Sequence, residues 1–302
     1  MSVTLLQLRA FAATVEHGSF GSAAAELGLT QSAVSHAVAS LEREIGGNVL
    51  TRRPRVAPTA LGKQLLPHAE TALRAADAIE AAAKQHGHDA SGEVRLGTVR
   101  TAAYGLIPAL LQSWRAAYPS IKVRLFEGDD DELPLWLEAG LLDAAILVDP
   151  TEPPSGTVLL GCDRYAVILP KDHPLAEESC VSPSDLIDDP MVLSDSGCAP
   201  YVKRIMTQAN PQFRPVSVVR DASALLSMVA AGIGVCLLPE IGRAMLPADL
   251  VMVRLEPSEE RQLFFAGPAN RDWIGPVQRL AEFCLEHPLN VPGLSTPHVL
   301  AS

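Results

Sequence analysis

A predicted helix over residues 31–45 has one apolar and one polar face. Its apolar residues recur at spacings of four, three and four, as in an amphipathic helix, and are Val34, Val38, Leu41 and Ile45. The polar face holds short side chains that donate and accept hydrogen bonds, namely Gln31, Ser32, Ser35, His36 and Ser40. Such groups can pair with base edges in the major groove of DNA. The face therefore predicts nucleic-acid recognition, and the alternative is the solvated side of an ordinary helical bundle.

Three arginines follow this helix. Arg52, Arg53 and Arg55 belong to a small predicted hairpin with strands at 49–50 and 55–56. Beside a recognition helix, a basic hairpin would lie over phosphates and give a salt-dependent affinity. A surface turn with solvated arginines is commoner for a lone basic triplet, but the position of this one favours the DNA interpretation.

Further helices must position the polar face. The apolar spacing predicts helices over 4–16 and 20–27. A tight turn follows at Gly28, and Thr30 can cap the next helix. This arrangement predicts a helix-turn-helix.

A longer helix is predicted over 59–86. It carries an alanine-rich, nearly heptad seam, which favours close pairing of two chains. The polar stretch 86–93 is interpreted as a linker. Its histidines, His86 and His88, have no third ligand nearby, so we expect no metal there.

From residue 94 onward, short β-branched runs alternate with helical segments, which predicts an α/β architecture. The expected strands lie at 94–98, 121–126, 144–148, 165–170, 191–194, 216–219, 234–238, 250–255 and 263–267. A weak repeat that places Gly140 and Gly232 92 residues apart favours two similar lobes. We expect the chain to cross between the lobes near 161–164 and 266–268, and a helix over 273–286 to return to the first lobe.

Polar residues follow three of the expected strands, where open α/β sheets bind ligands. They are Thr98, Arg100 and Thr101 after the first, Ser194, Ser196 and Cys198 after the fifth, and Asp221 and Ser223 after the sixth. We expect these eight residues to line an effector site. A helix start after the first strand would suit a small carboxylate. The alternative for each hydroxyl is simple helix capping.

An acidic run precedes another expected helix. Asp129, Asp130, Asp131 and Glu132 are interpreted as opening that helix and complementing its dipole. The less favoured alternative is an acidic lip on the cleft, which would repel anions and weaken the carboxylate expectation.

Composition narrows the class of protein. The chain has 302 residues, 48% apolar and 20% charged, as in globular proteins of roughly two or three domains. No run approaches the roughly 18 apolar residues of a membrane span, and no basic leader precedes Arg9, so we expect a cytoplasmic protein with no membrane partner. Five cysteines without a CxxC pair indicate reduced thiols. The motifs GxGxxG, GxSxG and HExxH are missing, so we expect no enzyme, cofactor or metal.

The net charge of −11 is unevenly distributed. Residues 1–90 hold eight basic and eight acidic residues, whereas the remainder holds sixteen basic and twenty-seven acidic ones. A neutral end with a basic cluster on an acidic chain weakly favours a nucleic-acid-facing head.

Residues 3–62 resemble the winged helix-turn-helix of LysR-type transcriptional regulators. The match is ungapped and includes Leu8, Phe11, Val15, Gly18, Ser19, Phe20, Ala23, Ala24, Leu27, Thr30, Gln31, Ser32, Ala33, Val34, Ser35, Leu41, Glu42, Ile45, Gly46, Leu50, Arg52, Thr59 and Gly62. Val49-Leu50 departs from the family's usual Leu-Phe, which we interpret as a change in packing only. The rest of the chain resembles the family's linker helix and effector domain by pattern more than by residue.

The resemblance implies an α/β protein with an all-α head. The winged helix-turn-helix DNA-binding domain would span 1–58, the linker and dimerisation helix 59–90, and a two-lobed α/β effector domain of periplasmic-binding-protein-like architecture 91–302. Lobe I would comprise 91–162 and 267–302, and lobe II 163–266.

The resemblance also implies a ligand-responsive, sequence-specific transcriptional regulator. Homodimers joined into a homotetramer would bind two-fold operator sites in double-stranded DNA, bend that DNA, bind a small-molecule effector between the lobes and act on the transcription machinery. Peroxide-sensing members of the family need a second cysteine a short distance after the first. None lies between 199 and 235, so Cys198 is interpreted as an inert or ligand-lining thiol.

Two other classes compete with this interpretation. A two-lobed solute receptor would fit the lobes but not the missing leader or the helical head. An α/β enzyme with a regulatory head would need a pair of catalytic groups, and the sequence does not supply one.

Overall fold

A computed structural model describes residues 3–51, 55–84 and 91–295. The chain divides near residue 88 into two compact units, a helical head and an α/β unit. The arginines Arg52 and Arg53 and the linker histidines His86 and His88 lie outside the described residues.

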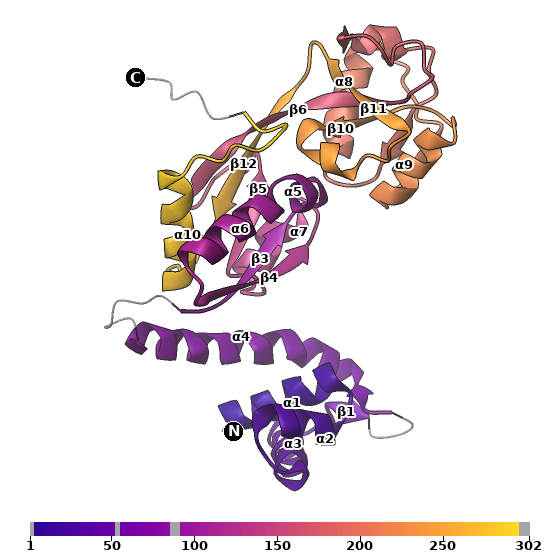
Figure 1. The fold of residues 1–302 in the computed structure, drawn as a ribbon. Coiled ribbons are helices and arrows are strands. Elements are labelled where there is room, and N and C mark those ends of the chain that lie inside the picture. Colours follow the sequence, from indigo (N-terminus) through magenta and orange to yellow (C-terminus); the bar gives the residue numbers. More distant parts are fainter. Residues whose placement is uncertain (1–2, 52–54, 85–90, 296–302) are drawn as a thin grey trace. The chain divides into compact units, whose positions relative to one another are not determined.

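The head begins with three short helices, α1 (Leu5–His17), α2 (Phe20–Leu27) and α3 (Gln31–Ile45) (Figure 1). Each begins at a side-chain cap and ends at a glycine. The capping hydroxyls belong to Thr4, Ser19 and Thr30, and the glycines have positive φ angles of 63°, 64° and 73° at Gly18, Gly28 and Gly46. A hydroxyl satisfies free backbone N–H groups, and glycine adopts the left-handed conformation without strain. The bounds of α2 and α3 therefore match the predicted ones.

A small hairpin and a long helix complete the head. The strands are β1 (Leu50–Thr51) and β2 (Ala57–Pro58), and the helix is α4 (Ala60–Lys84). The second strand lies two residues later than predicted, because Leu50 pairs with Pro58 and Thr51 with Ala57. The Thr59 hydroxyl accepts a hydrogen bond from the Gly62 N–H and donates one to the Asn48 carbonyl, which joins the start of α4 to the hairpin.

The α/β unit is built on one mixed sheet of eight strands that extends through two lobes. Its lobe I strands are β3 (Gly92–Thr98), β4 (Ile121–Glu127), β5 (Ala144–Val148) and β12 (Glu260–Ala266). β3 runs parallel to β4 and β5, and β12 runs antiparallel to β5. The helices of lobe I are α5 (Arg100–Gly105), α6 (Ile107–Ala117), α7 (Glu132–Glu138) and α10 (Gly275–Glu286).

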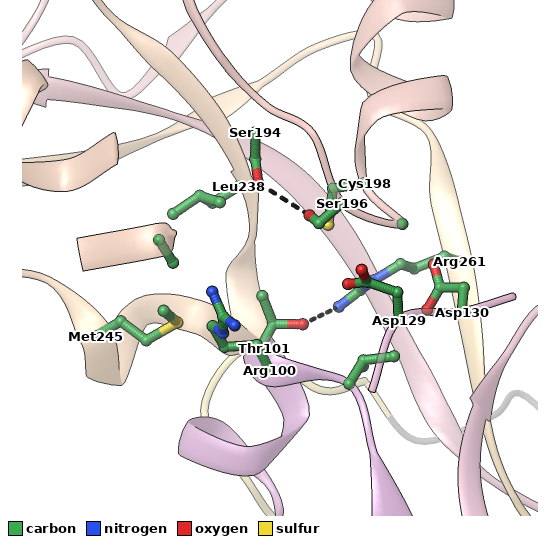
Figure 2. A pocket seen from close by; sticks show the side chains of 13 residues that line it. Arg100, Thr101, Asp129, Asp130, Ser194, Ser196, Cys198, Leu238, Met245 and Arg261 are labelled. Atoms are coloured by element: carbon green, nitrogen blue, oxygen red, sulfur yellow. Dashed lines mark hydrogen bonds between the residues drawn. The ribbon is translucent and has the colours of Figure 1, made fainter. Parts of the chain in front are cut away.

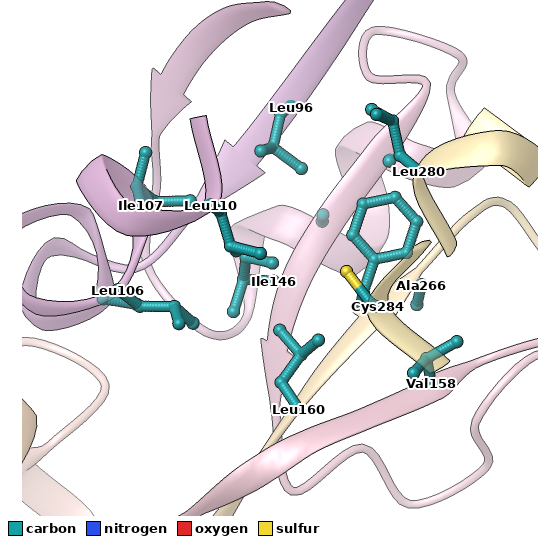
Figure 3. Close-up of a cluster of buried hydrophobic side chains, with 14 of the residues drawn as sticks. Leu96, Leu106, Ile107, Leu110, Ile146, Val158, Leu160, Ala266, Leu280 and Cys284 are labelled. Carbon is teal, nitrogen blue, oxygen red and sulfur yellow. The ribbon is translucent and has the colours of Figure 1, made fainter. Parts of the chain in front are cut away.

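The core of lobe I contains side chains from its strands and from α6, α7 and α10. Figure 3 shows part of it, including Leu96, Leu110, Ile146 and Leu280. Because α10 contributes Leu280 and Cys284 to this core, the expectation that the C-terminal helix returns to the first lobe is confirmed.

Lobe II surrounds the second half of the long strand β6 (Val158–Pro170), which pairs with β10 (Cys236–Pro239) and β11 (Leu250–Leu255). Its other elements are β7 (Cys180–Val181), the 3-10 helix η1 (Pro183–Leu186), β8 (Val192–Ser194), α8 (Ala199–Ala209), β9 (Ser217–Val219), α9 (Ala222–Ala230) and the 3-10 helix η2 (Glu240–Met245).

Both faces of β6 are covered in lobe II. Tyr165, Val167 and Leu169 face the core that includes α8, whereas Ala166 and Ile168 face the core that includes α9. Successive strand residues point to opposite faces, so a strand buried on both sides is an uninterrupted apolar run. This explains why 165–170 is readily predicted from the sequence.

The chain crosses between the lobes twice. β6 is the first crossing, because Gly161 pairs with β12 while Val167 pairs with β10 and β11. The return crossing lies between Leu255 and Glu260, and the predicted crossing near 266–268 is wrong, since β12 already pairs with β5 in lobe I. The strand 260–266 therefore belongs to lobe I; its polar beginning concealed its length in the sequence.

Outside the segments it leaves undescribed, the structure holds no helix long and apolar enough to cross a membrane.

A close contact at Gly62 supports the head. A methyl group there would lie 2.0 Å from the Val49 carbonyl oxygen, so Gly62→Ala should force α4 from the hairpin and destabilise the head by about 1–3 kcal/mol. The matched change Gly21→Ala in α2 has only the end of the Gln31 side chain nearby, at 3.9 Å, and should stabilise by up to about 1 kcal/mol. Hydrogen exchange of the full chain, resolved by peptide, measures both. Unchanged protection of α1–α4 in Gly62→Ala would contradict this packing.

Candidate nucleic-acid interface and ligand cavity

The polar face of α3 is open to solvent. Gln31, Ser32 and His36 are exposed, and Ser35 and Ser40 are half-buried. The opposite face is buried in the head, through Val34, Ala37, Val38 and Leu41. The predicted faces of this helix are therefore oriented as expected.

A shallow groove runs along this face beside the start of α1. Its lining residues are Thr4, Leu6, Gln7, Ser32, Ala33, His36, Ala37 and Ser40. The Gln7 Nε2 atom donates to the Ser40 Oγ at 3.0 Å, and so fixes α1 to α3. The Ser32 hydroxyl lies 3.0 Å from that of Thr30. Within the described residues, the side chains of Gln31 and His36 have no hydrogen-bond partner, so their polar atoms are available to a ligand.

The hairpin adds one described cation near this helix in sequence. Arg55 is exposed two residues before the second hairpin strand. Its predicted partners, Arg52 and Arg53, lie outside the described residues.

A cavity of about 40 Å³ lies between the two lobes of the α/β unit (Figure 2). Lobe I contributes Val99, Arg100, Thr101, Asp129, Asp130 and Arg261, and lobe II contributes Ser194, Ser196, Gly197, Cys198, Ala222, Leu238 and Met245. The structure thus brings together five of the eight residues expected there, namely Arg100, Thr101, Ser194, Ser196 and Cys198.

The other three expected residues do not line this cavity. Thr98 is buried, and its hydroxyl donates to the Val99 carbonyl. The Asp221 carboxylate caps α9 by accepting from the Ala224 N–H at 2.8 Å. Ser223 is exposed on α9.

The sequence reasoning missed Arg261, which is 1% exposed. Its Nε donates to the Asp163 Oδ1 at 2.6 Å, and its Nη2 donates to Asp163 Oδ2 and to Thr101 Oγ1, each at 3.0 Å. Burial lowers the pKa of Arg261, but the interaction with Asp163 raises that pKa by more than burial lowers it. The guanidinium therefore stays protonated. The only sequence signal for this pair is an acid beside a base in each of two strands, Asp163-Arg164 and Glu260-Arg261.

The acidic run has two separate roles. Glu132 begins α7, and its carboxylate accepts from the Asp129 N–H at 3.0 Å. Asp130 instead lines the cavity, and burial raises its pKa to about 6. The interpretation of the whole run as a helix start is wrong for Asp130, because the loop turns its side chain towards Gly197.

Polar contacts join the lobes around the cavity. Arg220 donates to the Asp129 carboxylate at 3.0 Å, and Arg100 donates to the Arg220 carbonyl at 3.4 Å. The Tyr201 hydroxyl donates to the Asp149 carboxylate at 2.8 Å. These contacts connect lobe I to lobe II beside the cavity.

Burial also determines the state of the cavity thiol. It raises the pKa of Cys198, which the charge of Arg261 only partly opposes. Since the thiolate is the reactive form of cysteine, the neutral thiol is a poor nucleophile.

An exposed polar face on a helix of the head and a small cavity between two α/β lobes suit a DNA-binding protein controlled by a small molecule. Family comparison agrees. Residues 5–63 match the family model described as bacterial regulatory helix-turn-helix protein, lysR family, and residues 87–288 match the LysR substrate binding domain. The chain belongs to the LysR family of transcriptional regulators, which are not enzymes.

Individual relatives cover nearly the whole chain. The HTH-type transcriptional regulator YvbU of Bacillus subtilis is 32% identical over 275 residues, covering 89% of this chain and 94% of the relative. A probable hydrogen peroxide-inducible genes activator of Mycobacterium leprae is 33% identical, with 92% and 88% covered. The full-length regulator CbnR, solved with its target DNA, shares the fold with a TM-score of 0.71 at 21% identity, with 94% and 99% covered.

The buried ion pair has an exposed counterpart one residue along each strand. Asp163→Ala should destabilise the α/β unit by about 3–5 kcal/mol, because it leaves the Arg261 charge buried and unpaired. The matched change Glu260→Ala breaks the exposed ion pair between Glu260 and Arg164, whose atoms lie 3.3 Å apart. Its expected cost in unfolding free energy is below about 1 kcal/mol. Urea unfolding followed by tryptophan fluorescence reports this unit, since Trp114, Trp136 and Trp273 all belong to it. Equal costs for the two changes would contradict the assignment.

Proposed function

We propose that this LysR-family regulator reads DNA sequence with Gln31, Ser32, Ser35, His36 and Ser40 of α3. The observation that carries the proposal is the open face of α3, on which the polar atoms of Gln31 and His36 lack partners within the described residues. Glutamine can pair with adenine edges, and small serines permit a close approach to the groove.

Arg52, Arg53 and Arg55 are proposed to contact phosphates beside the recognition helix. Such contacts position a protein on DNA without reading its sequence, and they make its affinity depend on salt. We assign residues 1–58 to DNA binding, 59–90 to the dimerisation helix and 91–302 to effector binding.

We propose that α4 pairs two chains. Ile79 on this helix is 72% exposed, and an exposed isoleucine on an alanine-rich seam favours burial against a second copy. Two chains would then present two recognition helices to a two-fold operator. By analogy with the family, we expect the dimers to join into a homotetramer in the cytoplasm and to act on the transcription machinery.

The cavity between the lobes is the proposed effector site, with Arg100, Thr101, Ser194, Ser196 and Cys198 as contacts. Thr98, Asp221 and Ser223 do not line it and are not proposed as contacts. An effector must favour one arrangement of the protein by typically about 1–3 kcal/mol to change its DNA binding. The Mycobacterium leprae relative is named for peroxide, but the raised pKa of Cys198 favours a thiol that only lines the site.

DNA reading is tested on the recognition face. The full chain should select preferred sequences from a randomised duplex library, and His36→Glu should then weaken binding to them by at least about tenfold, because it loses a contact and adds repulsion. The matched control Arg115→Gln makes the same change in net charge at an exposed position of α6 in the α/β unit. Fluorescence anisotropy at fixed salt measures both. Equal affinity of His36→Glu and the unaltered chain would contradict the proposed role of α3.

Effector binding is tested by two serines that the structure separates. Ser196 lines the cavity, whereas Ser223 is exposed outside it. In a thermal-shift screen of small metabolites, a compound that stabilises the chain should do so less in Ser196→Ala, because one hydrogen bond is lost. Ser223→Ala should respond like the unaltered chain. A full response in Ser196→Ala would move the site elsewhere.

A further inference from the structure

Almost every charged group that lines the cavity has a charged partner in the protein. Arg261 pairs with Asp163, Arg100 with Glu127 at 3.3 Å, and Asp129 with Arg220. The polar groups are also engaged, since the Ser194 and Ser196 hydroxyls lie 2.9 Å apart and Thr101 accepts from Arg261.

Asp130 is the exception. Among the described residues, its carboxylate forms no hydrogen bond and no ion pair, although it lines the cavity. A carboxylate that is largely removed from water without a partner is costly. An unmet acceptor in a ligand cavity is thus a position that a hydrogen-bond donor would satisfy.

The backbone opposite Asp130 is shaped to admit this carboxylate. A methyl group on Gly197 would lie 2.0 Å from the Asp130 Oδ2 atom. A side chain at position 197 would therefore displace the carboxylate from this place. The Asp130 side chain therefore lies close to lobe II at the cavity.

The remaining wall is apolar and the space is small. Val99, Ala222, Leu238 and Met245 supply the apolar lining. A volume of about 40 Å³ holds roughly three or four water-sized groups, given about 10–15 Å³ for each. The cavity thus suits a ligand of a few non-hydrogen atoms with one donor-rich end and one short apolar end.

We propose that the cavity binds a small organic ammonium ion, whose N–H groups donate to the Asp130 carboxylate while its alkyl end contacts the apolar wall. The proposal rests on the proposed effector site and names its ligand class. A carboxylate ligand, which the sequence favoured, would instead meet the unpaired Asp130 carboxylate, which has a like charge.

The proposal also fixes how binding depends on pH. Burial raises the pKa of Asp130 to about 6, so the carboxylate that holds the ammonium is lost below that pH. The pKa of Asp130 is also affected by the charges of Asp129, Asp131, Asp149 and Arg261. The charge of Asp130 in turn raises the pKa of Cys198 and Tyr201. Affinity should rise between about pH 5 and about pH 7 and then level off.

Three probes of similar size test the ligand class: ethylammonium chloride, acetamide and sodium acetate. Ligand-observed NMR and thermal shift on the full chain, with sodium chloride matching the ionic strength, should detect ethylammonium most strongly. Asp130→Asn should weaken its binding by about tenfold or more, the factor expected for a lost charge-assisted hydrogen bond. The matched variant Asp131→Asn removes an exposed charge from the same loop and should bind ethylammonium as the unaltered chain does.

Folding of the variant is not a concern for this test. Asp130→Asn removes an ionised group that is destabilised by burial, so without ligand it should raise the melting temperature at about pH 7 and leave it unchanged at about pH 4. Three results would each overturn the proposal. They are stronger binding of acetate or acetamide than of ethylammonium, no binding of ethylammonium, and equal binding of ethylammonium by Asp130→Asn and the unaltered chain. If sequence-selective DNA binding persists in such a case, the proposed regulator function stands and only the proposal of an ammonium ligand is rejected.

Discussion

Arg261 and Asp163 form an ion pair that is almost completely removed from water, at the point where β6 and β12 lie side by side. The residues face each other across β6 and β12, in the register Arg261 to Asp163. Taking two charges out of water costs several kcal/mol, and the cost is offset only where geometry and hydrogen bonding are good. Here two parallel hydrogen bonds supply that geometry, and the third donor contact holds Thr101 at the start of α5.

This pair shapes the electrostatics of the cavity. The charge of Arg261 is balanced by Asp163, so it does not leave a positive site for an anion. Arg220 balances Asp129 in the same way. Of the charged residues that line the cavity, Asp130 alone has no charged partner among the described residues. The cavity therefore has an acidic character, although Arg100 and Arg261 also line it. The contacts from Arg220 and Tyr201 reach across the lobes, so a ligand at Asp130 acts next to the groups that hold the lobes together.

Much of the fold could be predicted from local signals. The bounds of α2 and α3 follow from caps and left-handed glycines, and the buried half of β6 follows from its apolar run. The first half of β6 could not be predicted, because Gly161, Asp163 and Arg164 interrupt that run. The return crossing was misplaced for a related reason, since β12 begins with the polar residues Glu260, Arg261 and Gln262.

The site was harder to predict than the fold. Asp163-Arg164 and Glu260-Arg261 each place an acid beside a base, and the sequence does not reveal which member points inward. That choice depends on a strand register between residues 98 apart. Likewise, three consecutive aspartates look alike in sequence, and only the contact with Gly197 distinguishes Asp130. The cavity residues that were predicted, such as Ser194 and Cys198, follow strand ends, which is a local signal.

Footprinting of the full chain on the DNA upstream of its own reading frame tests the central claim most directly, namely that the open face of α3 reads sequence in a two-fold arrangement. The account predicts protected segments related by two-fold symmetry, with centres separated by a multiple of about 10–10.5 base pairs. Even protection along the fragment, equal to that on a scrambled fragment of the same composition, would contradict it.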